Sequence, residues 1–247
     1  MMETLNEFEK YTQQALANFA SKDAAKRDLL VDAVKDLKIE KVLDLGCGAG
    51  QELLPFLEKT DAVCIGVDID KKLGRMTKNL AVETERLSFV RSPGEKLPFA
   101  DGSFDVVLCR VALPYMNNRA AIGEIARVLR PGGVFLLKTH APLFYLGMIR
   151  DRLKTLSARQ LAYPLICLAA SFWHLLTARQ LQKGFWQGKE IFQTRAFLER
   201  EFAKNGLEIR DQLPDGNRAA PSFMVVKLAL LKMFMFAELF SNYGFVV

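Results

Sequence analysis

The sequence has few side chains that suit metal or acid–base chemistry. It contains two histidines, His140 and His174, and four cysteines that lie far apart, mostly within apolar runs. Cysteines in such positions are typical of reduced core residues, and their spacing excludes a disulfide framework or a zinc motif. We therefore expect no structural disulfide and no metal site.

The sequence also lacks a concentrated charge of one sign. The formal net charge is +6, but 34 basic residues are scattered among 28 acidic ones, and no basic run of the kind that binds nucleic acid occurs. This pattern argues against a nucleic-acid partner. The first residues lack the charged-then-apolar order of a secretory signal, so we expect a cytoplasmic protein.

Short β-rich runs alternate with amphipathic stretches along much of the chain. Helical spacing is predicted for residues 5–20, 23–37, 118–129 and 194–205. The predicted strands are residues 41–45, 62–69, 87–92, 104–111, 133–140, 207–213 and 222–230. Alternation of this kind predicts an α/β fold, a seven-stranded, mostly parallel sheet with helices on both faces and a late antiparallel strand.

A glycine-rich turn, VLDLGCGAGQ, follows the first predicted strand. Gly46, Gly48 and Gly50 remove side chains where a ligand must approach the backbone. Asp68 ends the second predicted strand, where a carboxylate accepts hydrogen bonds from ribose hydroxyls. Gln51 stands where a dinucleotide-binding turn needs glycine or alanine, so the pattern favours an adenosine ligand without phosphates.

Four segments, DLGCGAG, GVDID, EKLPFADGSFDVVLCR and EIARVLRPGGVFLL, occur in the order typical of one family. Over residues 40–140 the chain resembles class I methyltransferases related to quinone and sterol methyltransferases, with a Rossmann-like fold. The resemblance implies S-adenosylmethionine as cofactor. It implies the following cofactor-binding residues: Asp44, Gly46, Cys47, Gly48, Gly50, Asp68, Ile69, Gly94, Glu95 and Arg110.

The roles that the resemblance implies differ among these residues. Asp44 and the glycine turn hold the methionyl end, Asp68 takes the ribose, Ile69 packs on adenine, and Arg110 contributes backbone near the amino group. Relatives carry an acidic residue where this chain has Pro93. The adenine contacts would then rest on the backbone of Gly94 and Glu95, or Glu95 is a solvated turn residue.

The residue that would activate a methyl acceptor is harder to identify. Relatives often have histidines after the fourth strand, where this chain has Leu113 and Pro114. The remaining candidates for a catalytic role are Tyr115, His140 and His174. Each also has a purely structural interpretation, as a packed aromatic, a loop histidine or a buried histidine with a polar partner.

The segment 143–190 interrupts the alternating pattern and is unusually apolar. Residues 161–178 carry no charge, but Pro164 and His174 interrupt them, so we expect a helical lid over the substrate rather than a membrane span. Flanking lysines and arginines would also suit peripheral contact with an anionic membrane. The expected organisation is N-terminal helices (1–38), a cofactor domain (39–142 and 191–230), the lid insertion (143–190) and an apolar tail (231–247).

The leading hypothesis is a methyltransferase that acts on a lipophilic small molecule, such as a quinone precursor, polyketide or phenol. The alternatives are an RNA or protein methyltransferase and a non-catalytic binding module. The sequence leaves open whether oxygen, carbon or nitrogen is methylated, and whether the apolar tail forms a homodimer contact.

Overall fold

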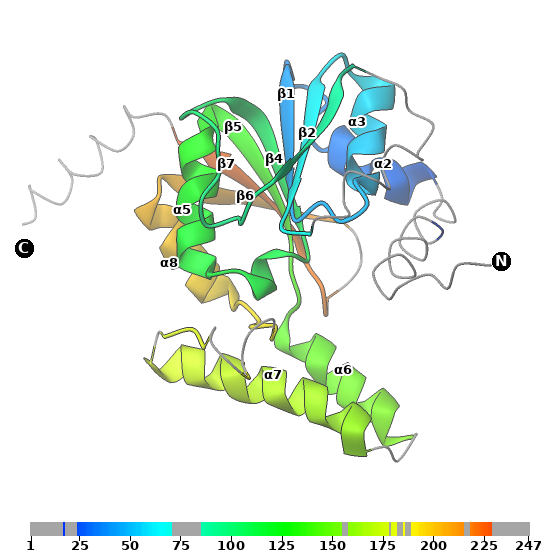
Figure 1. Cartoon of the computed structure of the whole chain (residues 1–247), viewed down its shortest axis with the longest axis vertical. Coiled ribbons are helices and arrows are strands. Elements are labelled where there is room, and N and C mark those ends of the chain that lie inside the picture. Colours follow the sequence, from blue (N-terminus) through cyan, green and yellow to red (C-terminus); the bar gives the residue numbers. More distant parts are fainter. Residues whose placement is uncertain are drawn as a thin grey trace, which may run out of the picture.

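A seven-stranded sheet forms the centre of the protein (Figure 1). The computed structural model describes residues 17, 24–70, 85–154, 158–177, 179–181, 185, 189–214 and 218–228. The sheet order is β3-β2-β1-β4-β5-β7-β6. The strands are β1 (Lys41–Leu45), β2 (Val63–Asp68), β3 (Leu87–Arg91), β4 (Phe104–Arg110), β5 (Leu129–Lys138), β6 (Leu207–Leu213) and β7 (Ser222–Lys227).

The first five strands pair in parallel, and β7 runs antiparallel to both β5 and β6. The predicted fold class is therefore confirmed. Strand β5 begins at Leu129, earlier than the expected residue 133, because the chain already pairs there with Phe104 before a register shift. A bulge of this kind admits Pro131 into a strand that its missing N–H would otherwise weaken.

Helices cover both faces of the sheet, as Figure 1 shows. The described elements are α2 (Ala24–Asp32), η1 (Gln51–Leu53), α3 (Leu54–Lys59), η2 (Leu113–Tyr115), α5 (Asn118–Val128), α6 (Pro142–Leu153), α7 (Ala158–Thr177) and α8 (Arg195–Lys204). Helices α2 and α3 lie on one face, and α5 and α8 on the other. Helices α5 and α8 each begin with an N-cap. The side chains of Asn117 and Thr194 accept hydrogen bonds from backbone N–H groups there.

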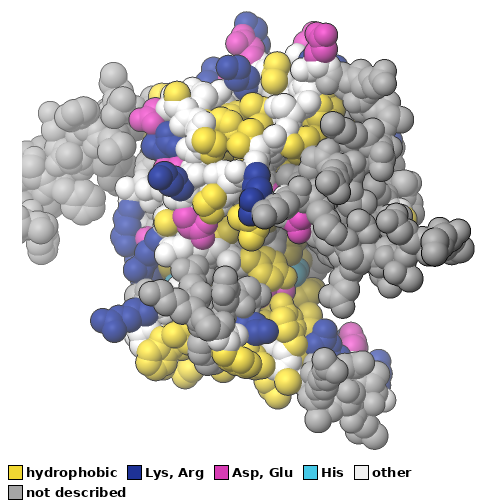
Figure 2. All heavy atoms as spheres, viewed as in Figure 1, with side chains coloured by type: hydrophobic (Ala, Val, Ile, Leu, Met, Phe, Trp, Pro, Cys, Tyr) yellow, Lys and Arg dark blue, Asp and Glu magenta, His cyan; other side chains and the backbone are white. Residues whose placement is uncertain are grey.

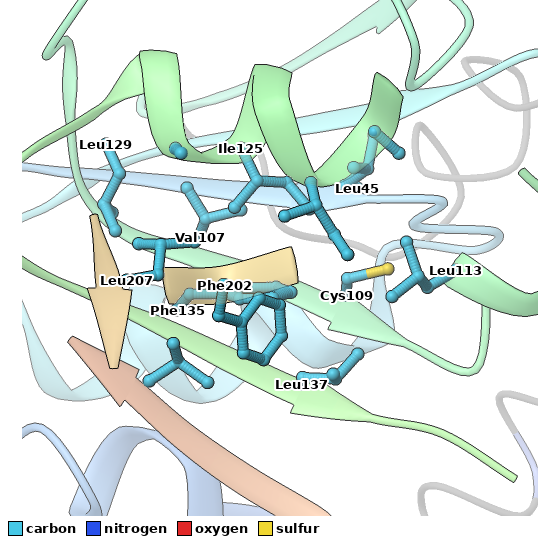
Figure 3. Close-up of a cluster of buried hydrophobic side chains, with 14 of the residues drawn as sticks. Leu45, Val107, Cys109, Leu113, Ile125, Leu129, Phe135, Leu137, Phe202 and Leu207 are labelled. Carbon is cyan, nitrogen blue, oxygen red and sulfur yellow. The ribbon is translucent and has the colours of Figure 1, made fainter. Parts of the chain in front are cut away.

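Two apolar clusters hold these layers together. Successive residues of the central strands point to opposite faces, so Val42 joins the cluster under α2 and α3 while Leu43 joins the cluster under α5 and α8. Figure 3 shows the second cluster, where Ile125 of α5 and Phe202 of α8 pack with Phe135 of β5. Burial on both faces explains why the strands read as continuous apolar runs.

The segment after β5 forms a pair of helices beyond the carboxyl edge of the sheet (Figure 1). Helices α6 and α7 pack against each other around buried Tyr145, Cys167 and Phe192. None of the described helices has the length and apolar character needed to cross a bilayer. The expected helix at 23–37 is shorter, because α2 ends at Asp32. Residues 5–20 (apart from Ala17) and the tail 231–247 lie outside the described residues.

Candidate functional site

A cavity of about 560 Å³ opens at the carboxyl ends of β1, β2 and β4. Ligands in open α/β sheets bind at this edge. Its lining residues are Leu45, Gly46, Gly48, Val67, Asp68, Ile69, Ser92, Gly94, Glu95, Arg110, Val111, Ala112, Tyr115 and Met116. Seven of the ten expected cofactor residues therefore line one cavity, and Asp44, Cys47 and Gly50 do not.

The glycine turn after β1 depends on backbone that only glycine adopts easily. Gly46 has φ of +71°, and a Cβ there would lie 2.1 Å from the Cβ of Ala112. Gly48 has φ of +52°, but a Cβ there would meet nothing within 4 Å. Gly46 is therefore required for packing, whereas Gly48 leaves open space beside the cavity. The Cys47 thiol packs toward Gly66 of β2, so only the backbone of Cys47 remains near the turn.

Asp68 holds the turn from the end of β2. Its Oδ2 accepts a hydrogen bond from Gly48 N at 3.1 Å, and its Oδ1 accepts one from Asp70 N at 3.1 Å. Each carboxylate oxygen has a second lone pair, so both can still accept from a ligand hydroxyl. Ile69 beside it is 66% exposed, which leaves an aliphatic surface for a flat apolar ring.

Asp44 lies buried below the turn, and its Oδ2 has no hydrogen-bond partner. Burial raises the pKa of the Asp44 carboxyl well above its usual range, and the nearby negative charge of Glu52 raises it further. The opposing influence is Arg110, which forms an ion pair with buried Glu52. An unsatisfied buried carboxyl oxygen of this kind suits a ligand that brings a donor or a positive charge.

Sequence reasoning missed Glu52. Its position in the first helical turn after the glycines could have pointed to it. An acidic residue there is often explained simply by a favourable interaction with the helix N-terminus. The structure instead pairs the buried Glu52 with the partly exposed Arg110, a residue that also lines the cavity.

The segment after β3 forms another wall of the cavity. The Glu95 carboxylate accepts a hydrogen bond from Asn117 N at 2.7 Å, so it fixes the loop that precedes α5. Ser92 Oγ donates to Lys96 O at 2.7 Å and closes the turn between them. A Cβ on Gly94 would lie 2.6 Å from the Met116 sulfur. The backbone of Gly94 and Glu95 remains available to a ligand in this wall.

Val111, directly after β4, has φ of +62°. A β-branched residue rarely adopts this conformation, which costs on the order of 1–3 kcal/mol. A hydrogen bond from Val111 N to Lys138 O at 2.8 Å holds it in place. The strained residue lines the cavity between Arg110 and Ala112, so the surrounding structure maintains it at the site itself.

Two of the three catalytic candidates meet at one buried carboxylate that sequence reasoning missed. Tyr115 lines the cavity and donates from its hydroxyl to Glu190 Oε1 at 2.5 Å. His140 Nδ1 lies 2.9 Å from Glu190 Oε2. Tyr145 of α6 and Tyr163 of α7 donate to the same carboxylate, each at 2.7 Å. Glu190 follows α7 in an irregular stretch without periodicity, so its sequence gave no signal.

Glu190 remains ionised despite its burial. Burial raises the pKa of the carboxyl, but hydrogen bonds from His140 and the three tyrosines outweigh that effect and lower it to about 2. Burial and the adjacent carboxylate raise the pKa values of Tyr145 and Tyr163, so both phenols stay protonated donors.

The third candidate, His174, lies apart from the cavity. It is buried on α7, and its ring meets the edge of Phe197 of α8 with centroids 5.0 Å apart. It lines a different hollow together with Arg119 and Arg200. Burial lowers the pKa of His174, as does the positive charge of Arg119. Its surroundings fit a packed histidine, and the structure does not bring it to the cofactor cavity.

The parallel sheet with a glycine turn and the Asp68 carboxylate at its carboxyl edge is a Rossmann-like arrangement, similar to that of solved S-adenosylmethionine-dependent methyltransferases. Residues 43–137, which include the glycine turn and Asp68, match the family described as "Methyltransferase domain".

Relatives that carry methyltransferase names match a stretch of similar length. Uncharacterized methyltransferase YcgJ of Bacillus subtilis is 41% identical over 103 residues, which cover 40% of this chain and 40% of that protein. The chloroplastic tocopherol O-methyltransferase of Arabidopsis thaliana is 31% identical over 114 residues, which cover 44% of this chain and 33% of that protein. The match therefore spans less than half the length of either relative.

The fold is similar to that of solved methyltransferases. A SAM-dependent methyltransferase from Methanosarcina mazei has a TM-score of 0.56 and 21% identity, over 80% of this chain and 97% of that one. The likeness supports the fold alone.

Proposed function

We propose that this protein transfers a methyl group from S-adenosylmethionine to a lipophilic small molecule, such as a quinone precursor, a polyketide or a phenol. The observation that carries this proposal is the cavity itself. The glycine turn and Asp68 form one side of it. Ala112, Met116 and Tyr115 form the other side, and Tyr115 connects this side to the aromatic residues packed between α6 and α7.

The residues present fit the proposed cofactor. Asp68 would accept hydrogen bonds from the ribose, exposed Ile69 would pack on adenine, and the backbone of Gly94 and Glu95 would meet the adenine edge. The unpartnered oxygen of Asp44, beneath the turn, suits the positively charged amino end. Bound S-adenosylmethionine supplies an electrophilic methyl group, so the protein mainly has to align the acceptor in a dry pocket.

The comparisons support the acceptor class. The Arabidopsis relative is a tocopherol O-methyltransferase, and sterol 24-C-methyltransferases of Gibberella zeae and Aspergillus fumigatus are also similar to this chain. Both names describe lipophilic acceptors, and the aromatic lining next to Tyr115 suits the same chemistry.

A transfer assay with a plain lipophilic probe tests the proposal. With methyl-labelled S-adenosylmethionine, we expect the label to appear in 2-naphthol or a short-chain hydroquinone and to partition into an organic solvent. Label in added transfer RNA or protein would favour the alternative substrates. Bound cofactor without label in any of them would instead support a non-catalytic binding module.

The insertion carries an apolar face that the described residues leave uncovered. Leu165, Phe172 and Leu176 follow one another along one side of α7 and are 53%, 61% and 70% exposed. The opposite side of the helix packs against α6, so α7 is apolar on both sides. Figure 2 shows apolar side chains gathered at this end of the molecule. Exposed Arg150 and Lys154 lie at the end of neighbouring α6.

We propose that this face rests on an anionic membrane and lets the lid draw a lipophilic acceptor from it. Replacing both Phe172 and Leu176 by glutamate should lower binding to phosphatidylserine-containing vesicles at least tenfold, because each buried side chain contributes on the order of 1.5–3 kcal/mol. Vesicle sedimentation measures the fraction of protein bound to the vesicles.

The control adds the same two charges elsewhere, as Ala120→Glu with Ala203→Glu on exposed positions of α5 and α8. Equal vesicle binding by the two double variants would contradict the membrane proposal.

A further inference from the structure

Glu190 joins five separate parts of the chain. Its Oε1 accepts from Tyr115 at 2.5 Å and Tyr163 at 2.7 Å, and its Oε2 accepts from Tyr145 at 2.7 Å and lies 2.9 Å from His140 Nδ1. We call these five residues the Glu190 cluster. The donors come from η2, α7, α6 and the segment after β5, so the cluster connects the insertion to the edge of the sheet.

The Glu190 cluster surrounds a buried carboxylate with hydrogen-bond donors. Glu190 is 5% exposed, and among the described residues no lysine or arginine pairs with it. Burying a carboxylate costs free energy unless donors or a positive charge compensate it. Three phenols and an imidazole provide the donors.

The His140 ring is held in one orientation. It stacks on Phe144 with centroids 3.6 Å apart and an angle of 9° between the planes, and it meets the edge of Tyr145. A neutral imidazole that donates from Nδ1 to the ionised carboxylate carries its lone pair on Nε2. Within the described part of the chain, no hydrogen bond to Nε2 occurs, and the side chain is 13% exposed. A carboxylate that orients an imidazole in this way is the arrangement of a general base.

The Glu190 cluster reaches the cofactor cavity through Tyr115. The Tyr115 side chain lines the cavity, and its hydroxyl shares the Glu190 carboxylate with His140. His140 also lies two residues beyond Lys138, which pairs with Arg110 at the end of β4, another lining residue. The imidazole therefore belongs to the same edge of the sheet as the cavity.

We infer that His140 is the general base for an acceptor with an ionisable hydroxyl, a phenol or enol, and that Glu190 is the positioning residue that orients it. This inference rests on the proposed function. The acceptor O–H proton passes to His140 Nε2 while an oxygen lone pair forms the new bond to the methyl carbon. The carbon–sulfur bond breaks with its electron pair remaining on sulfur, and the proton later leaves His140 for water.

The test uses 4-nitrophenol as the acceptor probe with the protein loaded with S-adenosylhomocysteine, because the yellow phenolate is visible on binding. In the unmodified protein, the bound probe should ionise at a pH lower by about one unit, a tenfold change, than in His140→Gln. The groups that face His140 are Glu190 and Tyr145, with apolar Phe144 on the ring face.

His174→Gln is the matched control, because it makes the same replacement at a histidine that lies apart from the cavity and packs against Phe197. We expect its midpoint to match the unmodified protein. Equal midpoints in the unmodified protein and His140→Gln, or no binding of 4-nitrophenol, would overturn the inference. Calorimetry with S-adenosylhomocysteine on the same samples separates the two proposals, since its failure to bind the unmodified protein would count against the proposed function instead.

Discussion

Replacing Asp68 by alanine is expected to weaken the binding of S-adenosylmethionine at least tenfold. The Asp68 carboxylate lines the cavity at the end of β2, where it would accept charge-assisted hydrogen bonds from the ribose. Bonds of this type contribute on the order of 1.5–3 kcal/mol, which corresponds to roughly ten- to hundredfold in affinity. The substitution also removes the acceptor for Gly48 N, so the glycine turn loses one of its supports.

Isothermal calorimetry measures the affinity for the cofactor. Two further variants show whether a loss comes from the Asp68 carboxylate itself. Asp68→Asn keeps one carbonyl acceptor and should lose less affinity than the alanine variant. Asp61→Ala removes the same charge from an exposed residue before β2 that does not line the cavity, and its affinity should be unchanged. An Asp68→Ala protein that binds the cofactor as tightly as the unmodified one would refute the role assigned to the carboxylate.

Local patterns were sufficient to predict the sheet and the glycine turn that lines the cavity. The strands read as apolar runs because both faces are buried, and the turn at Gly46 is visible because its positive φ and its contact with Ala112 admit only glycine. Asp68 could be placed because it ends a strand. In each case, the residue's role depends on neighbours in sequence or on the regular geometry of a parallel sheet.

The acceptor side could not be predicted in the same way. Glu190 meets Tyr115 and His140, which precede it by 75 and 50 residues, and no periodic pattern records contacts of that range. His174 was a candidate because it lies in an uncharged stretch, where a polar ring needs a partner, and in the structure the ring packs against Phe197. A sequence pattern indicates that α7 is amphipathic or apolar. Which polar side chains become buried depends on how α6, α7 and α8 pack against one another.

Replacing Glu190 by alanine is expected to lower the free energy of unfolding by about 3 kcal/mol or more. Removing the carboxylate leaves the hydroxyls of Tyr145 and Tyr163 and the Nδ1 of His140 without their acceptor, and each buried donor without a partner costs about 1–3 kcal/mol. Urea unfolding at neutral pH measures the loss. Glu199→Ala, which removes an exposed glutamate from the surface of α8, should change stability by less than about 0.5 kcal/mol.

The pH dependence of the free energy of unfolding distinguishes an ionised Glu190 from a Glu190 that contributes by packing alone. The pKa of Glu190 falls from its ordinary 4.5 in the unfolded chain to about 2 in the folded protein. A carboxyl with a lowered folded pKa stabilises the protein above the unfolded value, and that stabilisation is lost as the pH falls from 4.5 toward 2. At 1.36 kcal/mol per pH unit, the loss is about 3 kcal/mol. The stability difference between the unmodified protein and Glu190→Gln should therefore shrink across this range. A difference that stays constant from neutral pH down to pH 3 would mean that the Glu190 carboxyl has the same pKa in the folded and unfolded protein, and the orientation of His140 would then need another explanation.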